Sequence, residues 1–412
     1  RDAGYYQQAF DVLEQAEATL KIGYDERSAL NVGAMTESVA SVLVNQKSLA
    51  YTGTIYDRVL LNTYKALAML ELNQIDNALV EARRIDQAQQ RAEELFREEY
   101  EAIKAEAEDK GYDVDLDKMY SNEKFVKQNR GLFKDTGVDD FQNPFATFVI
   151  GMLRRIAPNN GEDPTYDFQW LKDRLPSNIY VKQELEAIMN GENVDGSVYV
   201  IFENGRGPSL AENRITIPTG SFGYYSGSDG LRIFNEEYLA LPRFVPGRKA
   251  ANALEVIAGP ANRSTTMMVA DMNSIALHEF NARYPGILIR EMVSAAIKGI
   301  AFGVGQIVAT EMMSSDDEDT AILGLLLGIG SSVVKGAIAQ ADDRAWKSVA
   351  CNYQIARFKR GESNTLKLKL VGGNTATTVE MPDAAAVVVI VRSVNSSHIN
   401  ARAYGFGDPT IN

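Results

Sequence analysis

Two short stretches near the start of the chain share one spacing of turn, apolar and small residues. The matched positions are Gly4, Tyr6 and Ala9 in the first stretch and Asn73, Ile75 and Ala78 in the second. A residue that tolerates a turn lets the chain reverse, an apolar side chain closes the corner, and an alanine lets two helices approach closely. The spacing therefore predicts two helical hairpins and a helical start to the fold.

The distance along the chain between Ala9 and Ala78 is about twice the ~34-residue period of tetratricopeptide-like repeats, which stack such hairpins. A third hairpin is therefore expected over 29–44, where apolar residues recur at helical spacing without the small residues. The alternative is an irregular helical bundle in which short patterns match by chance. Stacked hairpins hold another molecule, so the pattern favours a binding protein over a self-contained active site.

The period of the hydrophobic pattern divides the chain into three segments. Residues 1–110 predict tetratricopeptide-like helices, of which 57–72 carries an apolar stripe and 83–110 is polar with mixed charge. Residues 111–192 hold shorter helical pieces separated by prolines and predict a helical linker or back layer. Residues 193–412 change to a pattern rich in strands and predict an α+β domain.

Within this third segment the expected order is strands, a helical pair, and strands again. Strands are expected at 197–202, 214–218, 241–246, 253–257, 353–358, 365–371 and 385–391. The helical pair covers 268–340, with one helix over 266–313 and an apolar one over 321–339. Strands on both sides of the helices imply one sheet that is completed from both ends. The predicted class is α+β, with N-terminal helical hairpins, a mostly antiparallel sheet and a buried apolar helical pair.

The apolar helix expected over 321–339 has glycines at a spacing that lets helices pack closely. Its apolar run is shorter than the ~18–20 residues that a membrane span needs, and Lys335 interrupts its end. A buried helical hairpin is therefore favoured, and a contact with a membrane or a second subunit is the alternative.

Charge and composition exclude several classes of function. The formal net charge of −13 argues against nucleic acid or an anionic lipid surface as the main partner. The single cysteine, Cys351, cannot form an internal disulfide and is expected in the core. Two histidines, His278 and His398, leave little for a transition-metal site or a histidine base. No cofactor, metal site or catalytic residue is predicted.

Two motifs of functional sites are incomplete. The acidic stretch 113–117 resembles the start of a calcium loop, but Lys118 and Lys124 stand where that loop needs glycine and glutamate. A zinc-protease pair would begin at His278, but Ala282 stands where the second histidine is required. Neither stretch is predicted to bind metal.

Five residues are predicted to contact a partner. Tyr5, Asn62 and Tyr64 are expected at exposed polar positions of the helical hairpins. Tyr224 and Tyr225 stand on a stretch rich in glycine and serine, 221–230, which is expected to be a flexible loop. Aromatic side chains on such a loop either contact a protein or glycan partner or pack against the sheet, and both interpretations remain open.

Four stretches spread over most of the chain carry a family resemblance: 56–67 (YDRVLLNTYKAL), 78–84 (ALVEARR), 341–346 (ADDRAW) and 354–357 (QIAR). They are similar to segments of an uncharacterised family of bacterial envelope lipoproteins with tetratricopeptide-like N-terminal halves. The resemblance implies a location on the periplasmic side of the outer membrane and an upstream signal segment that ends in a lipid-carrying cysteine. Membrane association is expected only through that inferred anchor, and the family implies no catalytic residues.

Together these observations predict a non-enzymatic envelope scaffold or adaptor that binds protein partners through its hairpins, alone or as a homo-oligomer. A subunit of a large ring or secretion-type assembly differs from this hypothesis only in assembly state. The alternative is a carboxylate-dependent hydrolase acting on a cell-wall polymer, because Asp and Glu alone can hydrolyse glycosidic bonds. That alternative requires a deep cleft with two facing carboxylates ~5–10 Å apart.

Overall fold

The structure, a computed structural model, describes residues 1–33, 51, 53–109, 112–114, 116–129, 134–157, 162–216, 222–225, 231–233, 238–259, 262–303 and 341–408. Its helices are α1 (Tyr6–Gly33), α3 (Ile55–Glu71), α4 (Ile75–Asp109), α5 (Leu116–Tyr120), α6 (Glu123–Gln128), α7 (Pro144–Ile156), α8 (Thr165–Arg174), α9 (Ile179–Met189) and α10 (Met272–Gly303).

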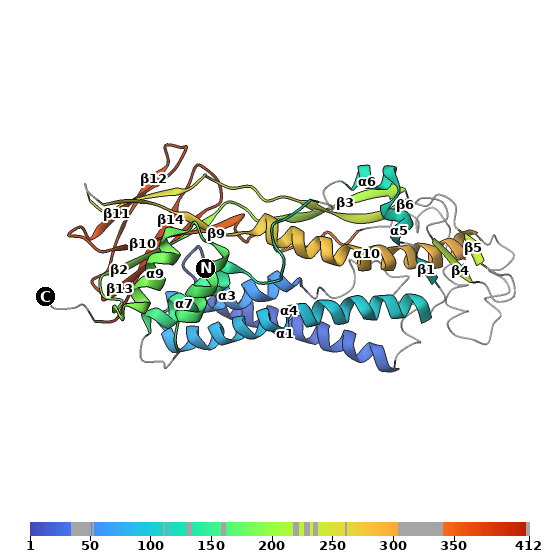
Figure 1. Ribbon diagram of the computed structural model, residues 1–412, viewed down its shortest axis with the longest axis horizontal. Coiled ribbons are helices and arrows are strands. Elements are labelled where there is room, and N and C mark those ends of the chain that lie inside the picture. Colours follow the sequence, from blue (N-terminus) through green and yellow to red (C-terminus); the bar gives the residue numbers. More distant parts are fainter. Residues whose placement is uncertain are drawn as a thin grey trace.

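The strands are β1 (Tyr112–Val114), β2 (Ser197–Asn204), β3 (Ser209–Thr216), β4 (Phe222–Tyr225), β5 (Leu231–Ile233), β6 (Tyr238–Val245), β7 (Leu254–Ile257), β8 (Arg263–Thr265), β9 (Met267–Asp271), β10 (Asn352–Lys359), β11 (Thr365–Leu370), β12 (Ala376–Glu380), β13 (Ala386–Ser393) and β14 (Asn400–Phe406). The molecule is elongated, with the larger sheets and α7 and α9 at one end, while α1, α4 and α10 run along the long axis toward the other (Figure 1).

Side-chain caps set the starts of several helices. Thr54 accepts a hydrogen bond from the Asp57 amide, and the Asp57 carboxylate accepts one from the Thr54 amide, which is a capping box at the start of α3. Asn143 caps α7 ahead of a proline at its first position, and Asn178 caps α9. Local sequence alone therefore fixes where these three helices begin.

The central sheet is built from both ends of the third segment. Its strand order is β14-β13-β2-β10-β9, and only the β13–β2 pair is parallel. Every residue of β2 and β13 is buried. Because β2 precedes α10 and β10, β13 and β14 follow it, the expectation of a mostly antiparallel sheet completed from both ends is confirmed.

A second sheet and two small ones accompany the central sheet. The second has the order β12-β11-β7-β8, and β11 buries Leu366, Leu368 and Leu370 in the main core while Thr365 and Lys367 are exposed. β3 and β6 form a two-stranded ribbon, and β1, β4 and β5 form the remaining sheet. The ribbon lies alongside α10 (Figure 1).

One apolar cluster joins the N-terminal helices to the central sheet. It contains buried side chains of α3, α4 and α7 together with those of β2, β10 and β13. The rings of Phe145 and Tyr353 stack with their centroids 3.9 Å apart, and the Tyr64 hydroxyl lies 2.8 Å from that of Tyr353. Burial of each such side chain contributes ~1.5–3 kcal/mol, so the helices and the sheet stabilise one another.

α3 is the centre of the helical layer. It forms an antiparallel hairpin with α4 through a turn in which Asn73 has a φ of 57°, in the left-handed region that asparagine tolerates. Ala78 and Ala82 of α4 are fully buried. The turn at Asn73 and the close helix approach at Ala78 are thus confirmed, whereas membership in a tetratricopeptide array stays a prediction.

Several predicted boundaries are wrong. The helix expected from 266 begins at Met272, because the five residues before it form β9 and pair with β10. Part of the expected loop 221–230 is strand β4, and the strand expected at 214–218 is the end of β3. β1 lies in a segment predicted as helical, and β5, β8, β12 and β14 were not expected. These strands are short or weakly alternating, so long-range pairing decides their structure.

Two further expectations fall outside the described residues. They are the second helix of the apolar pair, 321–339, and most of the third hairpin, of which only 29–33 is described, as the end of α1.

Candidate functional site

An apolar cleft lies where α4, α10 and the β3–β6 ribbon meet. Its volume is about 130 Å³, and we call it the α4–α10 cleft. Its walls come from α4 (Phe96, Glu99, Tyr100, Ile103), α10 (Phe280, Arg283, Ile287, Arg290), the ribbon (Leu210, Pro242, Phe244) and the segments around Tyr51 and Asp342. The cleft thus combines parts of the chain that are far apart in sequence.

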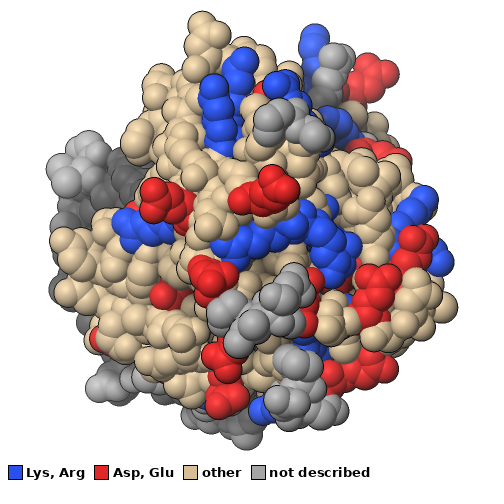
Figure 2. Space-filling model, turned by 90° about the vertical axis from the view of Figure 1, so that its left-hand side faces the viewer, with Lys and Arg blue, Asp and Glu red and all other residues tan. Residues whose placement is uncertain are grey.

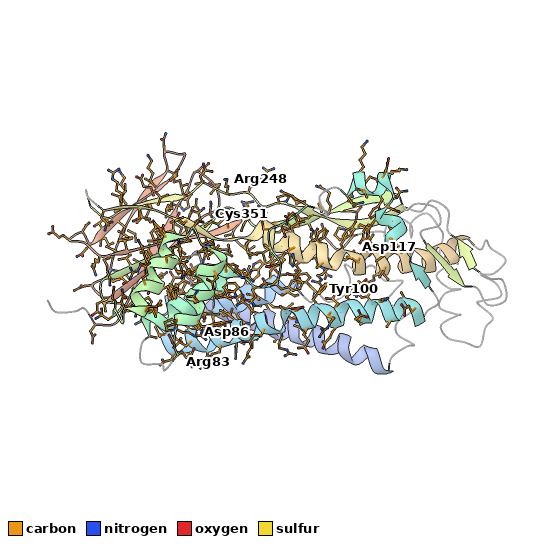
Figure 3. All side chains as sticks on the ribbon, viewed as in Figure 1. Arg83, Asp86, Tyr100, Asp117, Arg248 and Cys351 are labelled. Carbon is orange, nitrogen blue, oxygen red and sulfur yellow. The ribbon has the colours of Figure 1, made fainter. Side chains whose placement is uncertain are left out.

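Helical spacing places the cleft residues on facing sides of two helices. On α4 the residues Phe96, Tyr100 and Ile103 follow one another at intervals of four and three, and therefore share one face. At Gly286 of α10, an added Cβ would lie 3.0 Å from the Ile103 side chain. Tyr100, labelled in Figure 3, also borders Gly286, with Cδ2 3.8 Å from that position. The missing side chain at Gly286 is what lets α4 and α10 approach closely here.

An ion cluster forms one wall of the cleft. The Arg283 guanidinium donates to both carboxylate oxygens of Glu99 at 2.9 Å and to Glu279 at 3.3 Å. Burial works to lower the pKa of Arg283, but the two carboxylates outweigh it and hold that pKa above its usual value. Arg283 therefore stays charged and fixes the positions of both carboxylates.

Glu279 also completes the start of α3. Its two carboxylate oxygens accept hydrogen bonds from the Ile55 amide at 2.7 Å and from the Tyr56 amide at 3.0 Å, the first two amides of that helix. The residue is 2% exposed, and burial raises its pKa although Arg283 and the two amides oppose the rise. Glu279 thus joins α10 to α3 and closes the floor of the cleft.

A third carboxylate, Asp57, lies beside this cluster. Asp57 accepts a hydrogen bond from the Tyr51 hydroxyl at 2.6 Å, and burial raises the pKa values of both groups. Arg344, which pairs with Asp342 at 2.7 Å, lies over the Tyr51 ring at 5.3 Å from its centroid. The described carboxylates of the cleft wall are therefore each held by a hydrogen bond or an ion pair.

Arg290 differs from the other cleft cations. It stands two helical turns after Arg283 on α10, is half-buried, and makes no ion pair within the described part of the chain. Judged from the described residues, the cleft therefore offers an apolar interior with a positive charge at its border that no ion pair compensates. An apolar cavity of about 150 Å³ binds benzene, so this cleft has room for about one aromatic or branched aliphatic group.

The described residues contain no group of three or more His, Cys, Asp or Glu side chains placed to hold a metal ion. Cys351 is 4% exposed, as expected of a core residue, and burial raises the pKa of its thiol. Over the same residues, no helix combines the length and apolar character of a membrane span.

The predicted contact residues do not converge on the cleft. Tyr5 is exposed, with 65% of its surface accessible, and its role in binding stays a prediction. The expectation that Asn62 and Tyr64 are exposed is wrong, because they are only 7% and 8% accessible. The reason is that α3 is enclosed on its polar side as well, so Tyr64 bonds to Tyr353 and lies under the Arg1 guanidinium.

Tyr224 and Tyr225 lie on β4, whose backbone pairs with β1 and β5. Their side chains are outside the described part of the structure, so their contact with a partner stays a prediction.

Sequence analysis missed the residues of the α4–α10 cleft. The available signal was the spacing of Phe96, Tyr100 and Ile103 within a helix that was otherwise polar, and the matching spacing of Phe280, Arg283 and Ile287. Each set predicts an apolar stripe on its own helix. Nothing in either stripe shows that the two face each other.

Comparison of the chain with protein-family models, with curated proteins and with solved structures finds no match.

Proposed function

We propose that this chain is a non-enzymatic scaffold that binds a protein partner, and that the α4–α10 cleft receives an apolar side chain of that partner. The observation that carries the proposal is the apolar cleft itself, whose lining carboxylates are held by Arg283, Arg344 and main-chain amides. A small apolar pocket inside a larger surface is the usual anchor point of a protein interface.

The elongated shape supports the same proposal. The central sheet and the distal ends of α4 and α10 lie at opposite ends of the molecule (Figure 1). The cleft is lined by residues 96–103 of α4 and 276–290 of α10, which precede these distal ends. A rigid body of this form can hold one partner at the cleft and present its sheet end to another. Placement on the periplasmic side of the bacterial outer membrane through a lipid anchor, alone or as a homo-oligomer, is part of the proposal and rests on the family resemblance.

The hydrolase alternative is less well supported by the contacts of the cleft. Glu99 and Glu279 both border it, but Arg283 lies between them and pairs with each. Both oxygens of Glu279 already accept amide hydrogen bonds at the start of α3, so the protonation that acid or base catalysis requires would weaken this cap. We therefore assign both carboxylates to the architecture of the cleft.

Site-specific photocrosslinking tests the proposal. A photoreactive phenylalanine analogue at Tyr100 should give an adduct of discrete mass in the cells that make the protein. Leu210→Trp fills the cleft from the ribbon and should abolish that adduct. Val80→Trp adds the same group to α4 at a position that is 41% exposed and should leave the adduct unchanged.

Two results would contradict the proposal. One is an adduct whose yield is the same in the Leu210→Trp and Val80→Trp proteins. The other is release of soluble fragments from purified cell wall by the wild-type protein but not by Glu279→Gln, which would establish the hydrolase.

A further inference from the structure

A second, open groove lies at the sheet end of the molecule, between α9, β8 and the last residues of β10. Its volume is about 790 Å³, within the ~300–1,000 Å³ typical of ligand sites. In contrast to the α4–α10 cleft, much of its lining is polar, including Gln183 of α9, the C-cap residue Asn190 that follows this helix, and Ser264 and Thr265 of β8. Figure 2 shows this end of the molecule, where basic and acidic side chains alternate over the surface.

The floor of this groove belongs to a buried cluster with two cations and one carboxylate. Glu184 of α9 lies 2.8 Å from Arg155 Nε and 2.7 Å from Arg357 Nε, and it accepts a hydrogen bond from the Tyr199 hydroxyl at 3.0 Å. The side chains of Arg155, Arg357 and Glu184 are 12%, 11% and 1% exposed. The cluster therefore carries an excess positive charge that is largely shielded from water.

Arg357 is the member of this cluster that borders the groove. One of its terminal nitrogens, Nη2, is buried and has no hydrogen-bond acceptor among the described residues. Buried donors almost always have an acceptor, so this nitrogen marks a position where one is missing. Lys359 also borders the groove, and burial together with the neighbouring Arg357 lowers its pKa. A carboxylate at the floor would supply the acceptor and offset the excess charge.

The strand that bears these cations also has a free edge. β9 pairs with β10 only from Asn352 to Ile355, because the chain preceding β9 leaves at Thr266 for the second sheet. Within the described residues, 356–359 therefore have no strand partner on that side. Asn262 approaches this side, with Nδ2 3.5 Å from the Lys359 carbonyl oxygen, and β8 lies nearby but pairs with β7. Unpaired main-chain groups of this kind accept an extended peptide as an added strand.

We propose that this groove binds an extended peptide through one carboxylate, which contacts Arg357 and Lys359 while the peptide backbone pairs with the free edge of β10. Glu186 and Glu192 also line the groove and repel acidic groups away from its floor. The site therefore selects a single, correctly placed carboxylate rather than a run of acidic residues. It is separate from the α4–α10 cleft and does not depend on the function proposed for that cleft.

Calorimetric titration with blocked pentapeptides tests this proposal. A peptide with one central glutamate should bind at least about tenfold more tightly than its glutamine counterpart, because it makes a charged hydrogen bond. N-methylation of the amides that flank the glutamate should weaken binding, because it removes the main-chain donors. Leu210→Trp should leave binding unchanged, which separates this site from the cleft.

Matched variants locate the site. Lys359→Gln should weaken binding of the glutamate peptide about fivefold, whereas Lys367→Gln, an equal charge change at an exposed position on β11, should not alter it. Arg357→Gln should abolish binding, and if that variant fails to fold, the Lys359 and Lys367 variants still decide the question.

Three outcomes would overturn the proposal. They are equal affinity for the glutamate and glutamine peptides, affinity unaffected by N-methylation, and inorganic phosphate or glucuronate binding as tightly as the peptide. The last result would show a simple anion site without peptide recognition.

Discussion

Replacement of Lys65 by methionine is predicted to weaken the attachment of α1 to the rest of the molecule. The Lys65 ammonium is fully buried and lies 2.6 Å from Glu14 and from Glu17 of α1, and 3.2 Å from Glu81 of α4. It is therefore the cation that joins three helices. Methionine keeps the unbranched apolar stem, so the change removes the charge with little loss of packing.

The size of the effect follows from what the substitution leaves behind. Glu81 is 5% exposed, and in the variant Arg84, 2.9 Å away, is the cation that still pairs with it among the described residues. Removal of one partner from a buried ion pair costs ~3–5 kcal/mol. Because Arg84 still compensates part of the charge and Glu14 is 44% exposed, we expect a loss near the lower value, about 3 kcal/mol.

Urea unfolding followed by circular dichroism gives the free energy, and hydrogen exchange over 6–20 shows whether α1 opens separately. The control is Lys104→Met, which removes a 54% exposed lysine 4.0 Å from Glu108 and should cost less than about 0.5 kcal/mol. Burial already raises the pKa of Glu81 and Lys65 opposes that rise, so without Lys65 this pKa rises further and protonation at low pH removes the uncompensated charge. The deficit of Lys65→Met should therefore shrink as the pH falls from 7 to 5.

A loss no larger than that of Lys104→Met would refute the reasoning. So would a deficit that is independent of pH, because it would show that lost packing, and not uncompensated carboxylate charge, destabilises the variant.

Three further predictions concern stability. Burial raises the pKa of Glu71 to about 7, although Arg1 opposes the rise. The protonated carboxyl therefore contributes its full stability below pH ~4.5, and this stability is lost as the pH rises through 7. Urea unfolding of Glu71→Gln between these pH values should show a decline in unfolding free energy that is smaller than that of the wild type by up to about 3 kcal/mol. At Gly205 the φ is 79°, and an added Cβ would lie 2.0 Å from the Arg248 carbonyl oxygen, so Gly205→Ala should lower the unfolding free energy in urea by about 3 kcal/mol. The control is Gly191→Ala, which has a similar φ of 68° but open space around the added Cβ, and it should lower that free energy by about 1 kcal/mol. Asn73→Val should lower the thermal midpoint by an amount equivalent to about 1–2 kcal/mol, and Asn73→Gly should leave it nearly unchanged; equal midpoints would contradict the role assigned to the left-handed turn.

The sequence analysis succeeded where a structural signal is local. The apolar stripe of α3, the turn at Asn73, and the long apolar strands β2, β10 and β13 all follow from residues a few positions apart. These elements were sufficient to predict the α+β class. The short strands β8, β12 and β14 were missed because their stability comes from neighbours that are distant in sequence.

The sequence by itself determined which helices have an apolar face, where the turn at Asn73 falls and that strands follow the helices. Only the tertiary structure decided that α3 lies at the centre of the helical layer, where Asn62 and Tyr64 lose their contact with water. Only the tertiary structure brought the aromatic stripe of α4 against α10 to form a cleft, and left the end of β10 without a described strand partner on the β9 side, next to Arg357. Periodicity shows that a face is apolar or polar, but what that face meets depends on packing between segments that may be hundreds of residues apart.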